Sequence, residues 1–177
     1  AYLMQRYRLD WWGLDYAEAM VSAANAYLAG RSPRIGCWVI WQGDILEWKP
    51  GMVDKNGNRD LLYTRFDLAY SQRCIVNLPT REQQQQAIRN VLALLEPGGQ
   101  YLMVECSADG LAETNEWRAL VGLPAIVPPA HNRYLNEPEV LELAYHLLRE
   151  GIIASMAPAE PICPTYTFCS RVINAYL

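Results

Sequence analysis

The stretch LDWWGLD, residues 9–15, decides the fold, because it is a short apolar run that ends in an acid, Asp15. An apolar pattern at helical spacing follows it, and this pattern consists of Ala17, Met20, Val21, Ala24, Tyr27 and Leu28. Gly30 is placed to end that helix. A second apolar run, CWVIW at 37–41, reads as a buried strand and is again followed by an acid, Asp44. A strand, a helix and a strand in this order predict two parallel strands joined by a helical crossover.

The alternation of strands and helices continues along the chain. FDLAY at 66–70 is predicted to be a third strand and QYLMVE at 100–105 a fourth. Between them, Thr80 and Gln83 form a capping box at the start of a helix whose apolar residues follow at helical spacing. These apolar residues are Ile88, Val91, Leu92 and Leu95. The turn Pro97-Gly98-Gly99 is expected to stop this helix before the fourth strand.

The C-terminal part is predicted to contain one helix and two short strands. The helix covers 139–149, with Asn136 as its N-cap. Residues 151–156 and 166–174 are predicted to be strands. A parallel pair would need a crossover of about a dozen residues, usually a helix, and the Pro-rich connection 157–164 offers none. The two strands are therefore expected to form an antiparallel hairpin.

Together these elements predict an α/β fold, with a Rossmann-like, doubly wound open sheet in a three-layer α/β/α arrangement. The sheet is expected to be mostly parallel, with the antiparallel hairpin at its C-terminal edge. Residues 1–177 are expected to form a single domain, since this length fits one core. Hydrophobic residues make up 51% of the chain, which is too large a share for a disordered protein.

Charge and cysteine content exclude several classes of function. A formal net charge of −4 gives no general attraction to nucleic acid or to anionic membranes, so neither is expected as a partner. The sequence contains no run of about 20 apolar residues that would span a membrane, and no signal sequence is expected. The five cysteines contain no C-x-x-C pair. They are expected to be buried, reduced thiols of a cytoplasmic protein, with no metal site.

Polar residues stand at the ends of all four predicted strands. In chain order they are Asp15, Asp44, Ser71-Gln72-Arg73 and Glu105. In open α/β sheets, ligands bind beyond the carboxyl ends of the strands. A carboxylate there can accept two hydrogen bonds from a ribose diol or one from an adenine amino group. The alternative for Asp15 or Asp44 alone is that it caps the next helix.

Four motifs occur in one order along the chain. They are GLDYAEAM at 13–20, QGDI at 42–45, FDLAYSQRCIVNL at 66–78 and LEPGGQYL at 95–102. In this order they resemble four elements of the class I S-adenosylmethionine-dependent methyltransferases. These elements are the second-strand motif, the adenine-binding turn, the fourth strand with its loop, and the L-x-P-G-G turn before the fifth strand. Each motif alone is weak, whereas four in register are specific.

The resemblance implies S-adenosylmethionine as the cofactor and assigns residues to its parts. Asp15 would bind the ribose hydroxyls and Asp44 the adenine amino group, with Ile45 packing on the adenine ring. Ser71, Gln72 and Arg73 would border the methionine moiety and the transferable methyl group. Two neighbours of the acids complete the expected cofactor-binding residues, and they are Tyr16 and Gly43.

One element of the family pattern is missing before Asp15. The family's glycine-rich loop should stand there after a first strand, but residues 1–8 contain no glycine. In the doubly wound order that first strand is central to the sheet. The chain is therefore expected to be an N-terminally incomplete fragment of a longer product, and residues 1–177 alone are expected to bind the cofactor weakly.

The resemblance also implies an in-line methyl transfer to a small-molecule acceptor, such as a sugar or natural-product hydroxyl. A general base helps a hydroxyl acceptor, and the candidates are His131 and Tyr134. The alternative for His131 is a surface or structural histidine. Glu105 is either a further base or a residue that fixes a loop amide. His146 lies within a helical apolar pattern and is expected to be a packed residue of that helix.

Two motifs that the sequence lacks narrow the range of possible methyl acceptors. The loop after the third strand reads SQRC at 71–74, not the N/D-P-P-Y/F of enzymes that methylate the amino group of adenine or the amide of glutamine. No Pro-Cys dipeptide is present to supply the nucleophile of cytosine C5 methylation.

Two other functions remain open at this point. An NAD-dependent oxidoreductase of Rossmann type also places an acid after its second strand, to bind the ribose of NAD. A catalytically degenerate domain that serves as a partner or scaffold would account for the missing glycine loop. The identity of the acceptor and the oligomeric state do not follow from the sequence.

Overall fold

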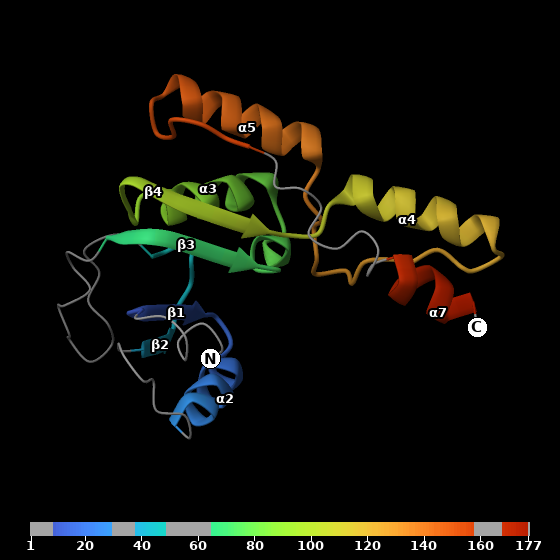
Figure 1. Ribbon diagram of the computed structural model, residues 1–177, viewed down its shortest axis with the longest axis horizontal. Coiled ribbons are helices and arrows are strands. Elements are labelled where there is room, and N and C mark those ends of the chain that lie inside the picture. The colour runs from blue at the N-terminus through green and yellow to red at the C-terminus, as the bar shows by residue number, and fades with distance from the viewer. Residues whose placement is uncertain (1–8, 30–37, 49–64, 158–167, 177) are drawn as a thin grey trace. The chain divides into compact units, whose positions relative to one another are not determined.

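The computed structural model describes residues 9–29, 38–48, 65–157 and 168–176 (Figure 1). It divides the chain into two units, Ala1–Arg65 and Phe66–Leu177, here called the N-terminal unit and the C-terminal unit. The single domain over residues 1–177 stays a prediction. No helix among the described residues combines the length and apolar character that crossing a membrane requires.

The N-terminal unit has the predicted strand–helix–strand order. Strand β1, Trp11–Asp15, pairs in parallel with β2, Trp38–Gln42. Helix α2, Glu18–Ala29, lies between them in sequence and contacts both strands. The side-chain amide of Asn25 donates to the carbonyl of Ile40 over 3.2 Å, which fixes α2 against β2. The predicted residues Gly30 and Cys37 lie outside the described residues.

An aromatic cluster stabilises the two strands of the N-terminal unit. The rings of Trp12 and Trp41 meet edge to face, with centroids 5.6 Å apart. The ring centroids of Trp41 and Trp48, a residue in the turn after β2, lie 5.5 Å apart. Edge-to-face pairs at such distances add to the free energy gained from burying apolar surface. The cluster therefore accounts for three of the six tryptophans as packing residues.

The C-terminal unit contains a second parallel pair of strands. Strand β3, Phe66–Gln72, pairs with β4, Leu95–Val104. The connection consists of a short 3₁₀-helix η2, Ile75–Asn77, and helix α3, Arg81–Leu92. The two residues Ile75 and Val76 of η2 are fully buried. They belong to the core of this unit and hold the loop after β3 in place.

Local sequence signals explain both ends of the connection between β3 and β4. The hydroxyl of Thr80 accepts a hydrogen bond from the Gln83 backbone N–H over 3.2 Å, so Thr80 is confirmed as the N-cap. The reciprocal half of the predicted capping box is not formed, because the side-chain oxygen of Gln83 has no hydrogen-bond partner among the described residues. Helix α3 ends at Leu92, and Leu95 is a buried residue of β4 rather than of the helix. Gly98 adopts φ 86°, in the region that favours glycine. A Cβ at Gly99 would lie 2.9 Å from the carbonyl oxygen of Glu96, so this irregular start of β4 needs both glycines. The prediction that Pro97-Gly98-Gly99 stops the helix is wrong, because α3 ends earlier and these residues lie within β4.

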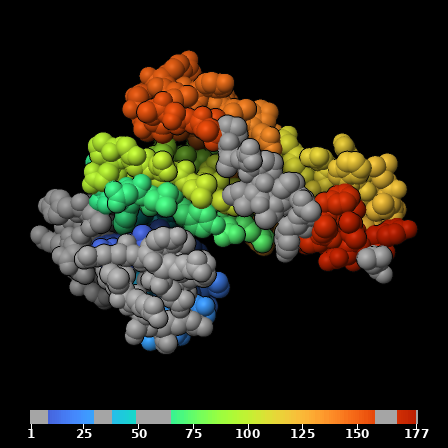
Figure 2. Space-filling model, viewed as in Figure 1, coloured from blue at the N-terminus to red at the C-terminus, as the bar shows by residue number. Residues whose placement is uncertain are grey.

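Two helices follow β4. Helix α4, Ala108–Leu120, was not expected from the sequence, because its residues form no clear apolar stripe. Helix α5, Glu137–Arg149, is confirmed, and the Asn136 side chain caps it by accepting from the Glu139 N–H. Its inward face buries Leu143, Ala144 and Leu147, while its outer face forms part of the exposed surface in Figure 2.

Ion pairs join α5 to α3 along their length. Arg89 binds Glu150, the residue after α5, through two hydrogen bonds of 2.6 and 3.2 Å. Arg81 binds Glu142, and this hydrogen bond raises the pKa of Arg81. These pairs are partly exposed, so they orient the two helices more than they stabilise them.

The predicted C-terminal hairpin is wrong. Residues 151–157 form no strand, and the segment predicted as its partner is helical where the structure describes it. It contains a π-helix η3, Cys169–Ile173, and a short helix α7, Asn174–Tyr176. Arg118 of α4 donates to the carbonyl oxygen of Arg171, and Phe168 meets Trp117 edge to face at 5.9 Å. Packing against α4 therefore overrides the strand propensity of this segment.

Two further expectations need correction. The described strands form two separate two-stranded sheets, so parallel pairing with helical crossovers is confirmed but one continuous, three-layer doubly wound sheet is not. The thiols of Cys74 and Cys169 are exposed and that of Cys106 is half-buried, so the prediction of buried cysteines is wrong for these three. The remaining cysteines, Cys37 and Cys163, lie outside the described residues.

Candidate functional site

The two acids of the N-terminal unit lie at one edge of its sheet. Asp15 is the last residue of β1, and Asp44 stands two residues beyond Gln42, the last residue of β2. Because the strands are parallel and Asp15 pairs with Gln42 in register, both carboxyl ends meet at the same edge. The Gly43 N–H donates to the Asp15 carbonyl oxygen over 3.0 Å. The structure therefore brings Asp15 and Asp44 together.

Each of these carboxylates uses one oxygen for local structure. Oδ1 of Asp15 accepts from the Ala17 N–H and Oδ1 of Asp44 from the Leu46 N–H, each over 2.8 Å. Both bonds close local turns and neither caps a helix, because Ala17 precedes α2 and Leu46 lies in a turn. In the part of the chain that the structure describes, Oδ2 of neither acid has a protein partner. Local turns therefore occupy one oxygen of each carboxylate and leave the other oxygen able to accept a hydrogen bond.

The predicted neighbours of the acids shape the same edge. A Cβ at Gly43 would lie 2.6 Å from Cδ1 of Leu14, so a side chain here would displace the apolar packing behind the acids. Tyr16 is 76% exposed, and the Gln42 side chain donates to its carbonyl oxygen over 3.1 Å. Ile45 is half-buried beside Asp44. These three residues therefore lie next to the acids.

The loop after β3 is organised by Glu105 in the C-terminal unit. Its Oε1 accepts from the backbone N–H groups of Cys74 and Ile75, over 3.1 and 3.2 Å, and its Oε2 accepts from that of Val76 over 3.3 Å. The Ser71 hydroxyl also donates to Oε1, over 3.1 Å. Of the two roles left open, a base or an anchor for loop amides, the structure shows the second.

Ser71, Gln72 and Arg73 differ in what their side chains contact. The Ser71 hydroxyl lies between Glu105 and the Tyr101 hydroxyl, 2.8 Å from the latter. Burial raises the pKa of Tyr101 well above its ordinary value, so this phenol stays protonated. The Gln72 side chain accepts from the Tyr70 hydroxyl over 2.7 Å. Arg73 has φ 52°, an unusual conformation for a residue other than glycine.

The segment with His131 and Tyr134 is fixed against this loop. The Arg133 N–H donates to the Val76 carbonyl oxygen over 2.8 Å, and the Leu135 N–H donates to that of Cys106 over 2.9 Å. The buried Gln84 side chain donates to the Arg133 carbonyl oxygen over 2.7 Å. Tyr134 lies between these two anchored residues. The structure therefore brings Tyr134 to the loop that carries Arg73.

The two predicted base candidates differ in environment. Burial and the neighbouring Cys106 raise the pKa of Tyr134, so its hydroxyl stays protonated near neutral pH and can donate a hydrogen bond. His131 is exposed, in a turn closed by a hydrogen bond from Asn132 to Pro129. His146 lies on α5 as predicted but is exposed, with Arg149 3.0 Å from its Nδ1, so the prediction of a packed side chain is wrong.

Sequence reasoning missed Arg171. The Arg171 carbonyl oxygen accepts from Arg118 of α4, which fixes its place in η3. The positive charges of Arg171 and Arg73 each act to lower the pKa of Tyr134, although burial raises it overall. The sequence pattern of 166–174 predicts an edge strand, so it gives no sign that Arg171 packs against α4.

Comparison with solved structures shows the fold. The YcgJ protein from Bacillus subtilis matches over 81% of this chain and 53% of its own, with 16% identity and a TM-score of 0.52. Magnesium protoporphyrin IX methyltransferase from Synechocystis was solved with bound SAH (S-adenosylhomocysteine). Its match covers 76% of this chain and 52% of its own, with 13% identity and a TM-score of 0.52. A SAM-dependent methyltransferase from Methanosarcina mazei matches over 76% and 66%, with 17% identity and a TM-score of 0.51.

These likenesses show that the chain has the α/β fold of class I SAM-dependent methyltransferases. The chain spans about half the length of the first two structures. A scan of protein-family models and a search of curated proteins found no match.

Proposed function

We propose that this chain is a methyltransferase domain that uses S-adenosylmethionine to methylate a small-molecule acceptor. The observation that carries the proposal is the pair of carboxylates, Asp15 and Asp44, at one sheet edge of a chain with this fold. Solved structures with the same fold include one with bound SAH. The acidic net charge also favours a small-molecule acceptor over nucleic acid.

The cofactor's adenosine has the hydrogen-bond donors that the two acids lack. A ribose diol and an adenine amino group both donate, and an ionised carboxylate only accepts. Oδ2 of Asp15 would take the ribose hydroxyls and Oδ2 of Asp44 the adenine amino group, while each Oδ1 keeps its bond to the loop. Ile45 would pack on the adenine ring, with Tyr16 and Gly43 beside it. The hydrogen-bond acceptors of this edge therefore fit the donors of the cofactor.

When bound, the cofactor would supply an electrophilic methyl group on a sulfonium for transfer to the acceptor oxygen. The chain's own residues hold and align the reactants, which can lower the barrier by several kcal/mol. His131 accepts the proton of a hydroxyl acceptor. The Tyr134 phenol, protonated near neutral pH, orients the acceptor by a hydrogen bond.

The remaining assignments stay predictions. Ser71, Gln72 and Arg73 are predicted to border the methionine moiety, although the Ser71 and Gln72 side chains already have protein partners. Two predictions rest on the sequence alone. One is that the acceptor is a sugar or natural-product hydroxyl, and the other is that the protein is located in the cytoplasm.

Calorimetric titration of the 177-residue chain with SAH and with NAD tests the proposal. We expect saturable heat with SAH and none with NAD, because the four ordered motifs resemble those of methyltransferases and a solved structure with this fold holds SAH. NAD binding without SAH binding would assign the chain to the oxidoreductases instead. Binding of neither ligand would favour the degenerate scaffold and contradict the proposal.

His131→Gln is expected to lower turnover without changing the affinity for SAH. Loss of a general base typically slows a reaction by about 10²–10⁴-fold. The measurement is SAH release across a panel of hydroxyl acceptors, with calorimetric SAH binding measured in parallel. His146→Gln is the matched control, because His146 is also exposed but lies on the outer face of α5. If the His131→Gln variant turned over as fast as the native chain, His131 would not be the base.

A further inference from the structure

Helix α4 is held to the segments around it mainly by polar side chains. The Asn115 side chain accepts from the Ile126 N–H over 2.7 Å and donates to the Ile126 carbonyl oxygen over 3.1 Å. The buried Arg118 donates to the carbonyl oxygens of Pro124 and Arg171. The covered side of α4 therefore carries an amide and a guanidinium group, where a surface helix usually carries apolar side chains.

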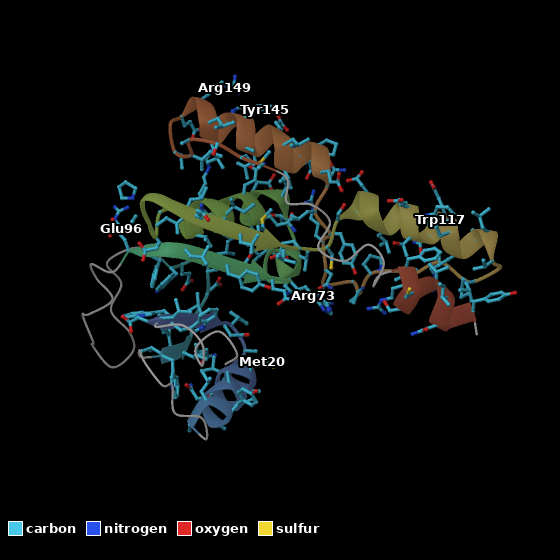
Figure 3. All side chains as sticks on the ribbon, viewed as in Figure 1. Met20, Arg73, Glu96, Trp117, Tyr145 and Arg149 are labelled. Atoms are coloured by element: carbon cyan, nitrogen blue, oxygen red, sulfur yellow. The ribbon has the colours of Figure 1, made fainter. Side chains whose placement is uncertain are left out.

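The large apolar residues at the C-terminal end of α4 lie on its exposed side. Trp117 (Figure 3), Leu120 and the C-cap residue Val121 follow at helical spacing, so they share one face. Leu120 is 77% exposed and Trp117 is 48% exposed. Phe168, whose ring meets that of Trp117 edge to face, extends this surface to the start of η3. Helix α4 thus turns polar groups toward its own chain and apolar groups toward solvent.

The exposed apolar surface is large enough to take part in an interface. Together with two exposed residues of η3 and α7, it consists of Trp117, Leu120, Val121, Phe168, Ile173 and Tyr176, here called the α4 patch. These residues expose on the order of 600 Å², most of the ~800 Å² that each partner buries in a standard interface. This area is also at the upper end for apolar patches of monomers, so the α4 patch indicates a protein interaction site.

The charges beside the α4 patch fit a second copy of the same chain. Glu113 is exposed one turn before Trp117, on the same face of α4. Arg171 is exposed on η3, and Arg118 near the C-terminal end of α4 holds its backbone. If two α4 helices pack antiparallel about a two-fold axis near Trp117, Glu113 of each copy lies along the end of the other α4 that holds Arg171. Such a symmetric contact brings opposite charges together twice.

We infer that the α4 patch is the interface of a symmetric dimer of this chain, in which the two α4 helices pack antiparallel. Burial of the apolar surface supplies the free energy of association. The pairs between Glu113 of one copy and Arg171 of the other set the orientation. The inference does not depend on the proposed function, since dimerisation requires neither cofactor nor acceptor.

Analytical ultracentrifugation of the 177-residue chain at increasing concentrations measures the association. We expect an equilibrium between monomer and dimer. Leu120→Glu is expected to weaken the dimer at least tenfold, because the dimer would then bury a carboxylate among apolar groups. Leu120 lies outside the core, so this variant should fold as the native chain does, which circular dichroism checks.

Tyr145→Glu is the matched control, because Tyr145 is a 63% exposed apolar residue of a different helix, α5 (Figure 3). We expect this variant to dimerise as the native chain does. A native chain that stays monomeric at every concentration would overturn the inference. Native dimerisation of Leu120→Glu would also overturn it, as would an equal loss in Tyr145→Glu.

Charge reversal tests the antiparallel arrangement. Glu113→Arg and Arg171→Glu are each expected to weaken the dimer about tenfold, because each variant sets like charges against each other across the interface. An equimolar mixture of the two variants is expected to associate as the native chain does, because each copy then meets the opposite charge. A contact within one chain could not produce this recovery. Unchanged association of both single variants, or no recovery in the mixture, would overturn the antiparallel dimer.

Discussion

Asp15→Ala is expected to weaken SAH binding about 5- to 150-fold, which corresponds to a loss of 1–3 kcal/mol for hydrogen bonds to a charged group. The variant removes the carboxylate that would accept the ribose hydroxyls. It also removes the bond to the Ala17 N–H at the start of α2. Calorimetric titration with SAH measures the loss of affinity, and urea unfolding shows whether the N-terminal unit stays folded.

Asp15→Asn separates the two effects of that substitution. The amide oxygen can keep the bond to Ala17, so this variant retains the turn and loses only the charge. We expect SAH affinity between those of the native chain and Asp15→Ala. Glu113→Ala, at an exposed acid of α4, is the control for net charge and should bind as the native chain does. If Asp15→Ala bound SAH with the affinity of the native chain, Asp15 would not belong to the cofactor site.

Glu105→Gln is expected to destabilise the chain by about 3 kcal/mol, because an amide cannot accept from all four donors around this side chain. Three of these donors are the backbone N–H groups of Cys74, Ile75 and Val76, and the last two belong to buried residues. A loss of this size corresponds to a fall in Tm of about 6–12 °C for a chain of this length. Urea and thermal unfolding measure it.

The control for Glu105 is an acid whose side chain is exposed. Glu116→Gln on α4 makes the same chemical change at an exposed position and should alter the free energy of unfolding by less than about 0.5 kcal/mol. If Glu105→Gln unfolded at the same urea concentration as the native chain, Glu105 would not be the anchor of this loop.

The sequence was sufficient to predict the elements whose signals are local. Residues 11–15 and 38–42 are short apolar runs with turn signals around them, and they are parallel strands in the structure. Thr80 and Asn136 each stand before a helix with an apolar stripe, and both cap it. In these places the hydrophobic period and the capping residue indicate the same structure, so little depends on distant contacts.

The elements that sequence reasoning missed depend on contacts between distant residues. Helix α4 has no clear apolar stripe, so hydrophobic periodicity did not indicate it. Residues 168–176 contain Val172 and Ile173, which favour strands, but the contacts with Arg118 and Trp117 of α4 accompany a helix. The error at the C-terminus therefore followed from missing α4.

The residues of the candidate site also divide into those that local sequence signals could predict and those that depend on distant contacts. The placement of Asp15 and Asp44 at one edge followed from parallel strands that end in acids. Glu105 had two readings from the sequence, because only the fold determines how many backbone N–H groups surround its carboxylate. The position of Arg171 could not be predicted, since it depends on the helical packing of η3 against α4.

A crystal structure of the chain with bound SAH tests the central claim most directly. The account predicts that the ribose hydroxyls lie within hydrogen-bond distance of the Asp15 carboxylate and the adenine amino group within that distance of Asp44. An adenosine bound elsewhere on the chain, or one from which both carboxylates are turned away, would contradict the account.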